Sequence, residues 1–350
     1  MVFLKEKRGM KNILKIKSSF AFTFKTCVKL TIIFIANPYE NDINVITLHF
    51  MKNMRTFDPK DLPIPQMHQF LLGAVGPRPI CFAATVDENG VNNLSPFSFF
   101  NVFSANPPIM IFSPARSGRT NTTKDTHNNV KKVPEVVINI VNYDIVQQMS
   151  LSSSPYEPGV DEFVKAGFTD LDSDLVKPKR VAESPVQFEC KVIEVKELGT
   201  EGGAGNLVIC EVVKFHIDES ILDENGKIDQ HKIDLVSRMG GNWYCRADEN
   251  SMFEIQKPLT TIGIGFDQMP EEVKNSSVLT GNDLGVLASV ENLPNETEVN
   301  EYKLIELSEL FVTLEDKATE LEKELHERAK RLIQDNKIEE AWMSLLAFNN

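Results

Sequence analysis

Short apolar runs separated by turn residues dominate the chain from residue 80 onward. Residues 80–86 are apolar and end at Asp87-Glu88-Asn89-Gly90, which is typical of a hairpin turn. Residues 91–102 would form the returning strand. Asn106-Pro107-Pro108 then separates that strand from a short buried strand over residues 109–112. This punctuation predicts an antiparallel β domain.

The second half of this region continues the pattern. Residues 135–141 are β-branched and predict another strand, which a short helix over residues 143–151 follows. Residues 187–195 alternate with a period of two, and residues 207–217 predict a matching strand. The glycine-rich residues 200–206 join these two strands and lack phosphate-loop spacing, so we expect a hairpin loop. The chain has no parallel βαβ pattern, which argues against a Rossmann domain.

The two ends of the chain differ from this β region. Near the C-terminus, apolar residues recur every three or four positions among dense Glu and Lys, at Leu314, Ala318, Leu321, Leu325, Ala329 and Leu332. They predict an amphipathic helix that packs on its own domain or takes part in dimerisation. Near the N-terminus, the apolar residues 20–36 are interrupted by Lys25 and Lys29 and are too short to span a membrane. Because no cleavage site follows, we interpret residues 1–50 as an extension upstream of a native start near Met51-Lys52-Asn53-Met54, with a targeting segment as the alternative.

Charge is distributed unevenly. The formal net charge is −13, and residues 1–50 carry +5 of it, with eight Lys or Arg against three acidic residues, so the remainder carries −18. An acidic body argues against nucleic acid as a partner, and an anionic cofactor would need a local cationic pocket. The five cysteines are scattered without metal-ligand spacing, which predicts reduced thiols in a cytoplasmic protein and no metal site.

Motifs of hydrolases, metalloproteases and nucleotide-binding loops are missing, since the chain has no G-x-S-x-G, no H-E-x-x-H and no P-loop. The six histidines form no close pair. Hydrolytic and metal chemistry therefore have little support.

The first stretch with candidate chemistry covers residues 92–101, where small hydroxyls alternate with aromatic residues around Pro96. Pro96 cannot donate to a strand ladder, so the stretch is either a bulged edge strand or irregular backbone that offers free N–H and C=O groups. A flat heterocycle needs such mixed donors and acceptors along one edge, with apolar groups against its face.

The second stretch covers residues 113–129, where Arg116, Arg119 and Lys124 lie among hydroxyl residues in an otherwise acidic protein. A short helix is expected after Lys124, and a helix N-terminus attracts phosphate. The stretch is either an anion site or a solvated polar loop.

Three blocks in this region resemble a known family. They are Val91-x-Asn93-Leu94-Ser95-Pro96-Phe97-Ser98-Phe99-Phe100, Pro107-Pro108-Ile109-Met110 and Lys124-Asp125-Thr126-x-x-Asn129. Their spacing resembles the flavin-reductase-like FMN-binding family, which includes flavoredoxin and the reductase components of two-component monooxygenases. The likeness extends from about residue 65 to residue 246, with later blocks at His216-Ile217-Asp218 and Arg238-Met239-Gly240-Gly241-Asn242-Trp243-Tyr244.

The resemblance implies a mainly β (α+β) fold, a six-stranded antiparallel Greek-key split β-barrel that forms a homodimer with FMN near the subunit interface. In such a site, residues 95–98 would contact the isoalloxazine ring, and the ribityl phosphate would be held by Ser113, Lys124, Thr126 and Asn129. Arg238, Gly240 and Tyr244 would close the pocket. The full set of expected cofactor-binding residues is Asn93, Ser95, Pro96, Phe97, Ser98, Ser113, Arg119, Lys124, Thr126, Asn129, Arg238 and Tyr244.

The implied reaction is hydride transfer from C4 of NADH or NADPH to N5 of the flavin, which needs stacking and exclusion of water more than an acid or a base. A flavoredoxin-like electron carrier, reduced by a redox partner protein, is one alternative. A split-barrel binding protein without catalysis is another. No residue of the sequence separates NADH from NADPH.

These observations predict four segments. Residues 1–53 are an extension outside the core, and residues 54–250 are the FMN-binding split barrel. Residues 251–300 contain a stretch, 263–294, that resembles an extension of a bacterial subgroup and would pack on the barrel. Residues 301–350 are the helical tail.

Overall fold

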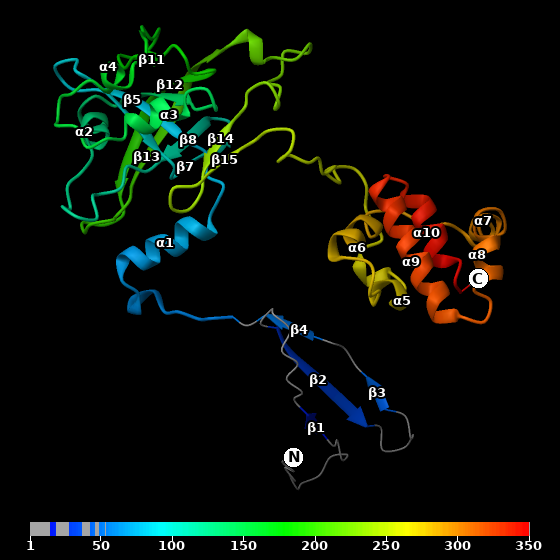
Figure 1. Ribbon diagram of the computed structural model, residues 1–350. Helices are drawn as coiled ribbons and strands as arrows, with labels where there is room; N and C mark the ends of the chain where they lie inside the picture. The colour runs from blue at the N-terminus through cyan, green and yellow to red at the C-terminus, as the bar shows by residue number, and fades with distance from the viewer. Residues whose placement is uncertain (1–14, 19–27, 37–42, 46–48, 53, 350) are drawn as a thin grey trace. The chain divides into compact units, whose positions relative to one another are not determined.

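The computed structural model describes residues 15–18, 28–36, 43–45, 49–52 and 54–349 (Figure 1). The chain divides into two compact units, residues 1–252 and 253–350, here called the sheet unit and the helical unit. Each unit is described by itself.

Four strands precede residue 53, and they pair with one another in an antiparallel sheet around β2: β1 (Lys15–Ser18), β2 (Val28–Ala36), β3 (Ile43–Val45) and β4 (His49–Lys52). The interpretation of residues 1–53 as an extension outside the core concerns residues that lie mostly outside the described ranges, and it stays a prediction.

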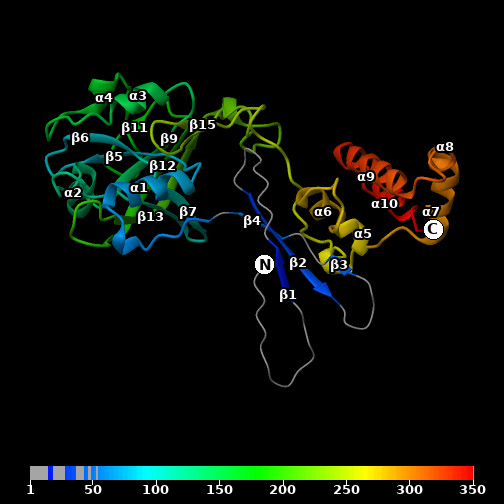
Figure 2. The same ribbon diagram turned by 60° about the horizontal axis from the view of Figure 1, so that its bottom comes forward.

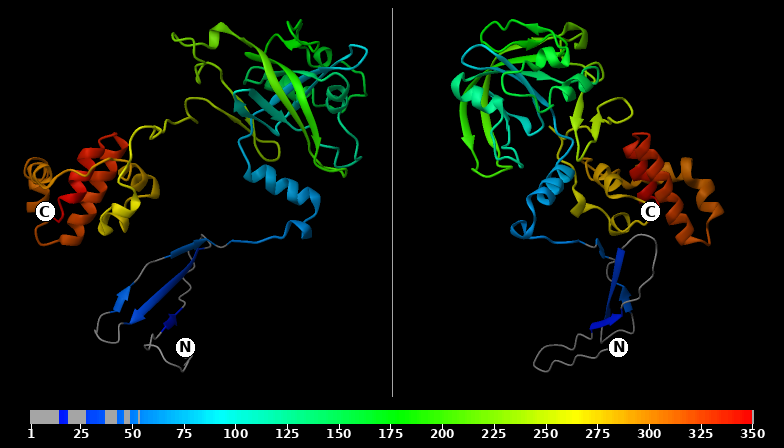
Figure 3. Two further views of the ribbon diagram at one scale, coloured as in Figure 1. Left: turned by 180° about the vertical axis from the view of Figure 1, so that it is seen from behind. Right: turned by 60° about the vertical axis from the view of Figure 1, so that its left-hand side comes forward.

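The main sheet of the sheet unit is antiparallel, in the order β6-β5-β9-β12-β13-β8-β7. Its strands are β5 (Cys81–Val86), β6 (Asn92–Phe97), β7 (Phe100–Ala105), β8 (Pro108–Phe112), β9 (Glu135–Ile140), β12 (Val186–Glu197) and β13 (Asn206–Ile217). The long pair β12 and β13 can be followed as two green arrows in Figure 3. The antiparallel β domain and its hairpins are therefore confirmed.

The described sheet has seven strands rather than the six expected. The single strand expected over residues 91–102 is divided at Ser98 and Phe99 into β6 and β7, which lie at opposite edges of the sheet. A flat sheet of this size would be about 29 Å wide. Residues 97 and 100 can be at most about 11 Å apart. The sheet must therefore curl until its two edges approach each other.

Apolar side chains fill both faces of this curled sheet. Phe82 and Ala84 of β5 belong to one hydrophobic cluster, whereas Cys81 and Ala83 belong to another, as the alternation of a strand requires. Helices α3 (Val146–Leu151) and α4 (Glu162–Ala166) cover the first cluster over β6 (Figure 2). Helix α2 (Asp125–Lys132) contributes Val130 to the second cluster.

Smaller elements complete the sheet unit. They are η1 (Pro59–Asp61), α1 (Ile64–Ala74), β10 (Asp170–Leu171), β11 (Arg180–Val181), η2 (Glu219–Ile221), β14 (Val236–Arg238) and β15 (Tyr244–Arg246). Among the described cysteines, Cys81, Cys190, Cys210 and Cys245 are free thiols, as expected. None of the helices in the described ranges has the length and apolar character needed to cross a membrane.

The helical unit contains η3 (Phe266–Gln268), α5 (Glu271–Lys274), α6 (Gly281–Leu287), α7 (Glu296–Tyr302), a π-helical turn over Lys303–Leu307, α8 (Ser308–Thr313), α9 (Ala318–Gln334) and α10 (Ile338–Leu346). The expected apolar stripe is buried along α9 at Leu321, Leu325, Ala329 and Leu332. Residues 264–293 belong to the segment 251–300 that we expected to pack on the barrel, and they share a core with α9 and α10 around Trp342. The two C-terminal segments thus form one compact unit, because the α9 stripe supplies the apolar cover that Leu284 and Leu287 need.

Candidate functional site

A pocket of about 240 Å³ opens at the corner where the chain passes from β6 to β7. It is called the corner pocket here, and its lining residues are His68, Leu72, Ser95, Pro96, Phe97, Ser98, Phe99, Ser113, Ala115, Lys124 and Ser153. Six of the expected site residues are among them: Ser95, Pro96, Phe97, Ser98, Ser113 and Lys124.

The corner exists because β6 is an edge strand that pairs with β5 on one side, opposite Phe82 at Pro96. Proline has no N–H for a second ladder, so Pro96 fits an edge strand, and the chain leaves the sheet at Ser98 and Phe99. Phe97 packs its ring against Phe112 in the core, at 5.6 Å between centroids. The N–H of Ser113 donates to the Phe99 carbonyl at 2.9 Å, which ties the corner to the end of β8. One wall of the pocket is therefore the end of edge strand β6 and the bend that follows it at Ser98 and Phe99, held by apolar anchors.

Lys124 forms the cationic end of the corner pocket. It is the N-cap of α2. The first N–H groups of a helix have no intrahelical partner, and in α2 the N-cap side chain makes no hydrogen bond to them. Among the described residues, Lys124 has no carboxylate within ion-pair distance. The Ser113 hydroxyl accepts from the Asn206 N–H at 3.0 Å and still has its own hydrogen to donate. The pocket can therefore hold a flat polar ring that carries an anionic group.

Asn93, Thr126 and Asn129 do not line this pocket, although we expected them to bind the cofactor. Their side chains are buried behind it, with Thr126 only 1% exposed. The Asn93 Oδ1 accepts from the Thr126 hydroxyl at 2.8 Å and from the Thr85 hydroxyl at 3.2 Å. The Asn129 amide donates to the Thr85 hydroxyl at 3.2 Å. These residues therefore form an internal network under the first turns of α2, called the Asn93 network here.

Glu162 completes the Asn93 network from the start of α4. Its carboxylate accepts from the Leu94 N–H at 2.8 Å and from the Asn93 amide nitrogen at 3.2 Å. Burial raises the pKa of Glu162 above its usual value, and the nearby Asp125 acts in the same direction, while these hydrogen bonds oppose the shift. Glu162 carries no distinctive signal in the sequence, because Asp161-Glu162 is typical of an ordinary acidic helix start.

The two arginines of the expected anion site lie outside the corner pocket. Arg116 donates from Nε to Asn121 Oδ1 at 2.8 Å and from Nη2 to the Asn121 carbonyl at 2.7 Å, so it stabilises its own loop. Arg119 is exposed on that loop. The glycine-rich loop packs beside it, where a Cβ on Gly202 would lie 3.1 Å from the Ser117 carbonyl oxygen. That loop joins β12 to β13 as a hairpin, which confirms the interpretation from the sequence.

Arg238 and Tyr244 also lie outside the pocket lining. The Arg238 guanidinium lies 4.5 Å from the centre of the Tyr244 ring. The buried Arg78 next to it donates to the Leu72 carbonyl at 2.8 Å and to the Met239 carbonyl at 2.9 Å. Burial, followed by the charge of Arg238, lowers the pKa of Arg78. This group therefore holds the C-terminal end of α1, which supplies His68 and Leu72 to the pocket.

His68 and Leu72 are pocket residues that the sequence analysis did not identify. Helix α1 begins after Pro63 and has no buried residue, so its apolar side chains gave no clear core pattern. Ser153 and Ala115 come from loops, where side chains carry no periodic signal. Only the folded chain brings these residues together.

Asp174, Glu189 and His216 offer ligand atoms within 4.8 Å of one another. Glu189 is fully buried and accepts from the backbone N–H groups of Asp174 at 2.9 Å and Val176 at 3.2 Å, and from that of Leu175 at 2.6 Å. His216 Nε2 lies 2.7 Å from Glu189, and the Lys214 ammonium contacts Asp174. Donors and cations of the protein already engage these oxygens, so the group is a structural clasp, called the Glu189 clasp here.

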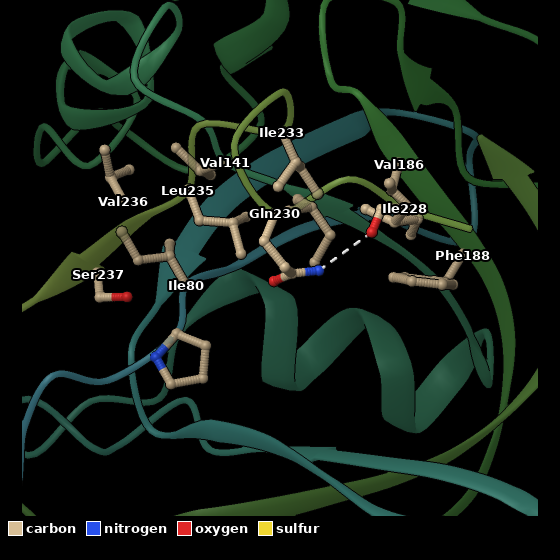
Figure 4. Close-up of a pocket in the computed structure, with 12 residues that line it drawn as sticks. Ile80, Val141, Val186, Phe188, Ile228, Gln230, Ile233, Leu235, Val236 and Ser237 are labelled. Atoms are coloured by element: carbon tan, nitrogen blue, oxygen red, sulfur yellow. Dashed lines mark hydrogen bonds between the residues drawn. The ribbon is translucent and has the colours of Figure 1, made fainter. Parts of the chain in front are cut away.

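A second cavity of the sheet unit, of about 260 Å³, has a different chemistry (Figure 4). Aliphatic and aromatic side chains of β9, β12 and residues 228–237 form most of its walls. Gln230 is the main polar group, and its amide donates to the Ile228 carbonyl at 3.3 Å. The lining of this cavity has no charged side chain, so it offers no cation to an anionic ligand, whereas the corner pocket is lined by Lys124.

Comparisons with known proteins find similarity over the sheet unit. The sequence model of a family described as flavin reductase like domain matches residues 75–232, which include β5 to β13. An uncharacterized protein of Aquifex aeolicus is 34% identical over 181 residues, 52% of this chain and 90% of that protein. An uncharacterized protein of Halalkalibacterium halodurans is 36% identical over 203 residues, 57% of this chain and 95% of that protein. The crystal structure of nitrilotriacetate monooxygenase component B from Bacillus cereus is similar with a TM-score of 0.55 and 28% identity, covering 59% of this chain and 100% of that one.

Proposed function

This chain belongs to the flavin reductase-like family, and on that premise we propose that it binds FMN in the corner pocket and oxidises NADH or NADPH. The observation that carries the proposal is the pairing of two unlike walls in one pocket. The end of edge strand β6 and the bend at Ser98 and Phe99 face the cavity from one side, and Lys124 with the start of α2 faces it from another.

The two walls fit the two parts of FMN. The free backbone groups and hydroxyls around Ser95 and Ser98 are suited to the polar edge of an isoalloxazine ring. Lys124, the α2 N-terminus and the Ser113 hydroxyl are suited to a phosphate dianion, to which each charge-assisted hydrogen bond contributes about 1.5–3 kcal/mol. Bound FMN would supply the hydride acceptor, with its N5 taking hydride from nicotinamide C4.

The residues of the chain then act by position rather than by proton transfer. The backbone at residues 95–99 holds the ring edge, while Leu72 and Phe99 give apolar surface that limits water. His68 lies at the pocket without a role in this scheme, because hydride transfer needs no general base.

We further propose that a second copy of the chain completes the site. A volume of about 240 Å³ is below the roughly 300–1,000 Å³ of most ligand pockets, so part of FMN would project from it. Beside the pocket, edge strand β7 exposes Val102 and Phe103, with Phe103 64% exposed. Such an apolar edge is typical of an interface. We also propose that the curled sheet is a split barrel with Greek-key topology.

Purified full-length protein tests the proposal directly. After incubation with FMN and removal of the excess, we expect visible flavin absorption bands and steady-state oxidation of NADH or NADPH with added free FMN. Flavin bands without oxidation of NADH or NADPH would exclude the reductase activity and favour an electron carrier. Absence of flavin bands would rule out the cofactor itself.

A further inference from the structure

Glu162 is a buried carboxylate that the proposed chemistry does not use. It is 8% exposed, and within the described part of the chain no Lys, Arg or His comes within ion-pair distance of it. Burying a carboxylate without a cation is costly, and an apolar side chain would serve the packing of α4 better. The core contact of α4 is already made by Phe163. A role other than packing is therefore indicated.

We propose that Glu162 is a positioning residue for the corner pocket, one that sets the Asn93 amide and through it the spacing between β6 and the start of α2. This inference rests on the proposed function, because the pocket it concerns is the proposed FMN site.

The donors and acceptors around Asn93 show how Glu162 sets the orientation of its amide. An ionised carboxylate can only accept, so Glu162 requires the Asn93 amide to present its nitrogen, as it does at 3.2 Å. The Asn93 oxygen must then face the opposite side, where Thr126 donates at 2.8 Å. With the amide reversed, its oxygen would meet the carboxylate and be repelled. Glu162 therefore decides which way the amide lies.

Each end of the Asn93 network lies close in sequence to a residue that lines the corner pocket. Leu94, whose N–H donates to Glu162 at 2.8 Å, directly precedes Ser95. Thr126, which donates to Asn93, comes two residues after Lys124. The network thus joins the ring-edge wall of the corner pocket to its cationic end, and both walls depend on one carboxylate of α4.

A matched set of variants tests the inference, with FMN affinity and thermal stability measured for each. Glu162→Ala removes every acceptor, and we expect FMN to bind about tenfold more weakly. Glu162→Gln keeps one acceptor oxygen of the same shape, and we expect a loss of only about threefold. Thr85→Val removes two hydrogen bonds of the network, the one donated to Asn93 and the one accepted from Asn129, without touching the pocket, and we expect a loss of about threefold to tenfold. It replaces Glu162→Ala as the test if that variant does not fold.

Asp161→Ala is the control. Asp161 caps α4 by accepting from the Phe163 N–H at 2.9 Å, and it also accepts from Asn92 rather than from Asn93. Its loss should lower the melting temperature and leave FMN affinity unchanged. Equal losses of FMN affinity in Asp161→Ala and Glu162→Ala would overturn the inference, as would unchanged affinity in folded Glu162→Ala or Thr85→Val. A wild-type protein that does not bind FMN would instead overturn the proposed function, and this inference with it.

Discussion

Glu162 and Glu189 are two buried carboxylates of the sheet unit that are held by different sets of donors. Burial is the largest single influence on the pKa of both carboxyls, and by itself it acts to raise each of them. At Glu189, the backbone hydrogen bonds and His216 together outweigh burial, so the pKa of its carboxyl is lowered. At Glu162 the donors are fewer and Asp125 adds a like charge, so the pKa is raised.

The different hydrogen bonding of the two carboxylates indicates different roles for the Glu189 clasp and the Asn93 network. In the Glu189 clasp, three backbone N–H groups and His216 contact one carboxylate, and these contacts hold residues 174–176 against β12 and β13. The Asn93 network leaves its carboxylate less well compensated and lies directly behind the corner pocket. We therefore expect damage to the clasp to appear as lost stability, and damage to the pocket region to appear as lost ligand affinity.

The largest effect should come from Glu189→Leu. The substitution removes the fully buried acceptor of three backbone N–H groups and His216. We expect the free energy of unfolding to fall by about 3–5 kcal/mol in urea titrations.

Glu194→Ala, on the exposed part of the same strand, is the control and should change the stability by less than about 0.5 kcal/mol. A Glu189→Leu loss as small as that of the control would show that the clasp is not a stabilising region. Where Glu189→Leu stays folded, its FMN affinity should match the wild type.

Lys124→Ala should give the opposite pattern. Loss of the charged end of the corner pocket should weaken FMN binding by about ten- to a hundredfold, or about 1.4–2.7 kcal/mol. Stability should hardly change, because the Lys124 side chain is exposed and unpaired among the described residues. Fluorescence titration of FMN measures the affinity.

Lys131→Ala is the matched control, since it removes the same charge from the other end of α2, where Lys131 pairs with Glu197 at 2.9 Å. Equal weakening of FMN binding by both variants would mean that general charge, rather than the pocket, attracts the phosphate.

Much of the fold could be predicted from the sequence, because strand signals are local. Apolar runs and period-two alternation located β5, β8, β9, β12 and β13. Local motifs likewise drew attention to Ser95 and Lys124, which line the corner pocket. The roles of Asn93 and Thr126 could not be predicted, because Asn93 contacts Glu162, 69 residues away in the chain, and Thr126, 33 residues away. Polar side chains in a short segment look alike whether they face a ligand or each other.

The pH dependence of stability should separate the two carboxylates by sign, with the smallest effect of the three. The folded pKa of Glu162 is raised, so its favourable contribution is present below the unfolded pKa of about 4.3 and is lost as the pH rises through the folded value. The folded pKa of Glu189 is lowered, so its contribution is present above about 4.3 and is lost as the pH falls. Compared with Glu162→Gln, the wild type should therefore lose stability as the pH rises, whereas compared with Glu189→Gln it should gain stability. Urea titrations of the three proteins between about pH 4 and about pH 8 measure this difference. Two curves of the same sign would mean that both carboxylates are equally well compensated, and the contrast between clasp and network would then lose its electrostatic basis.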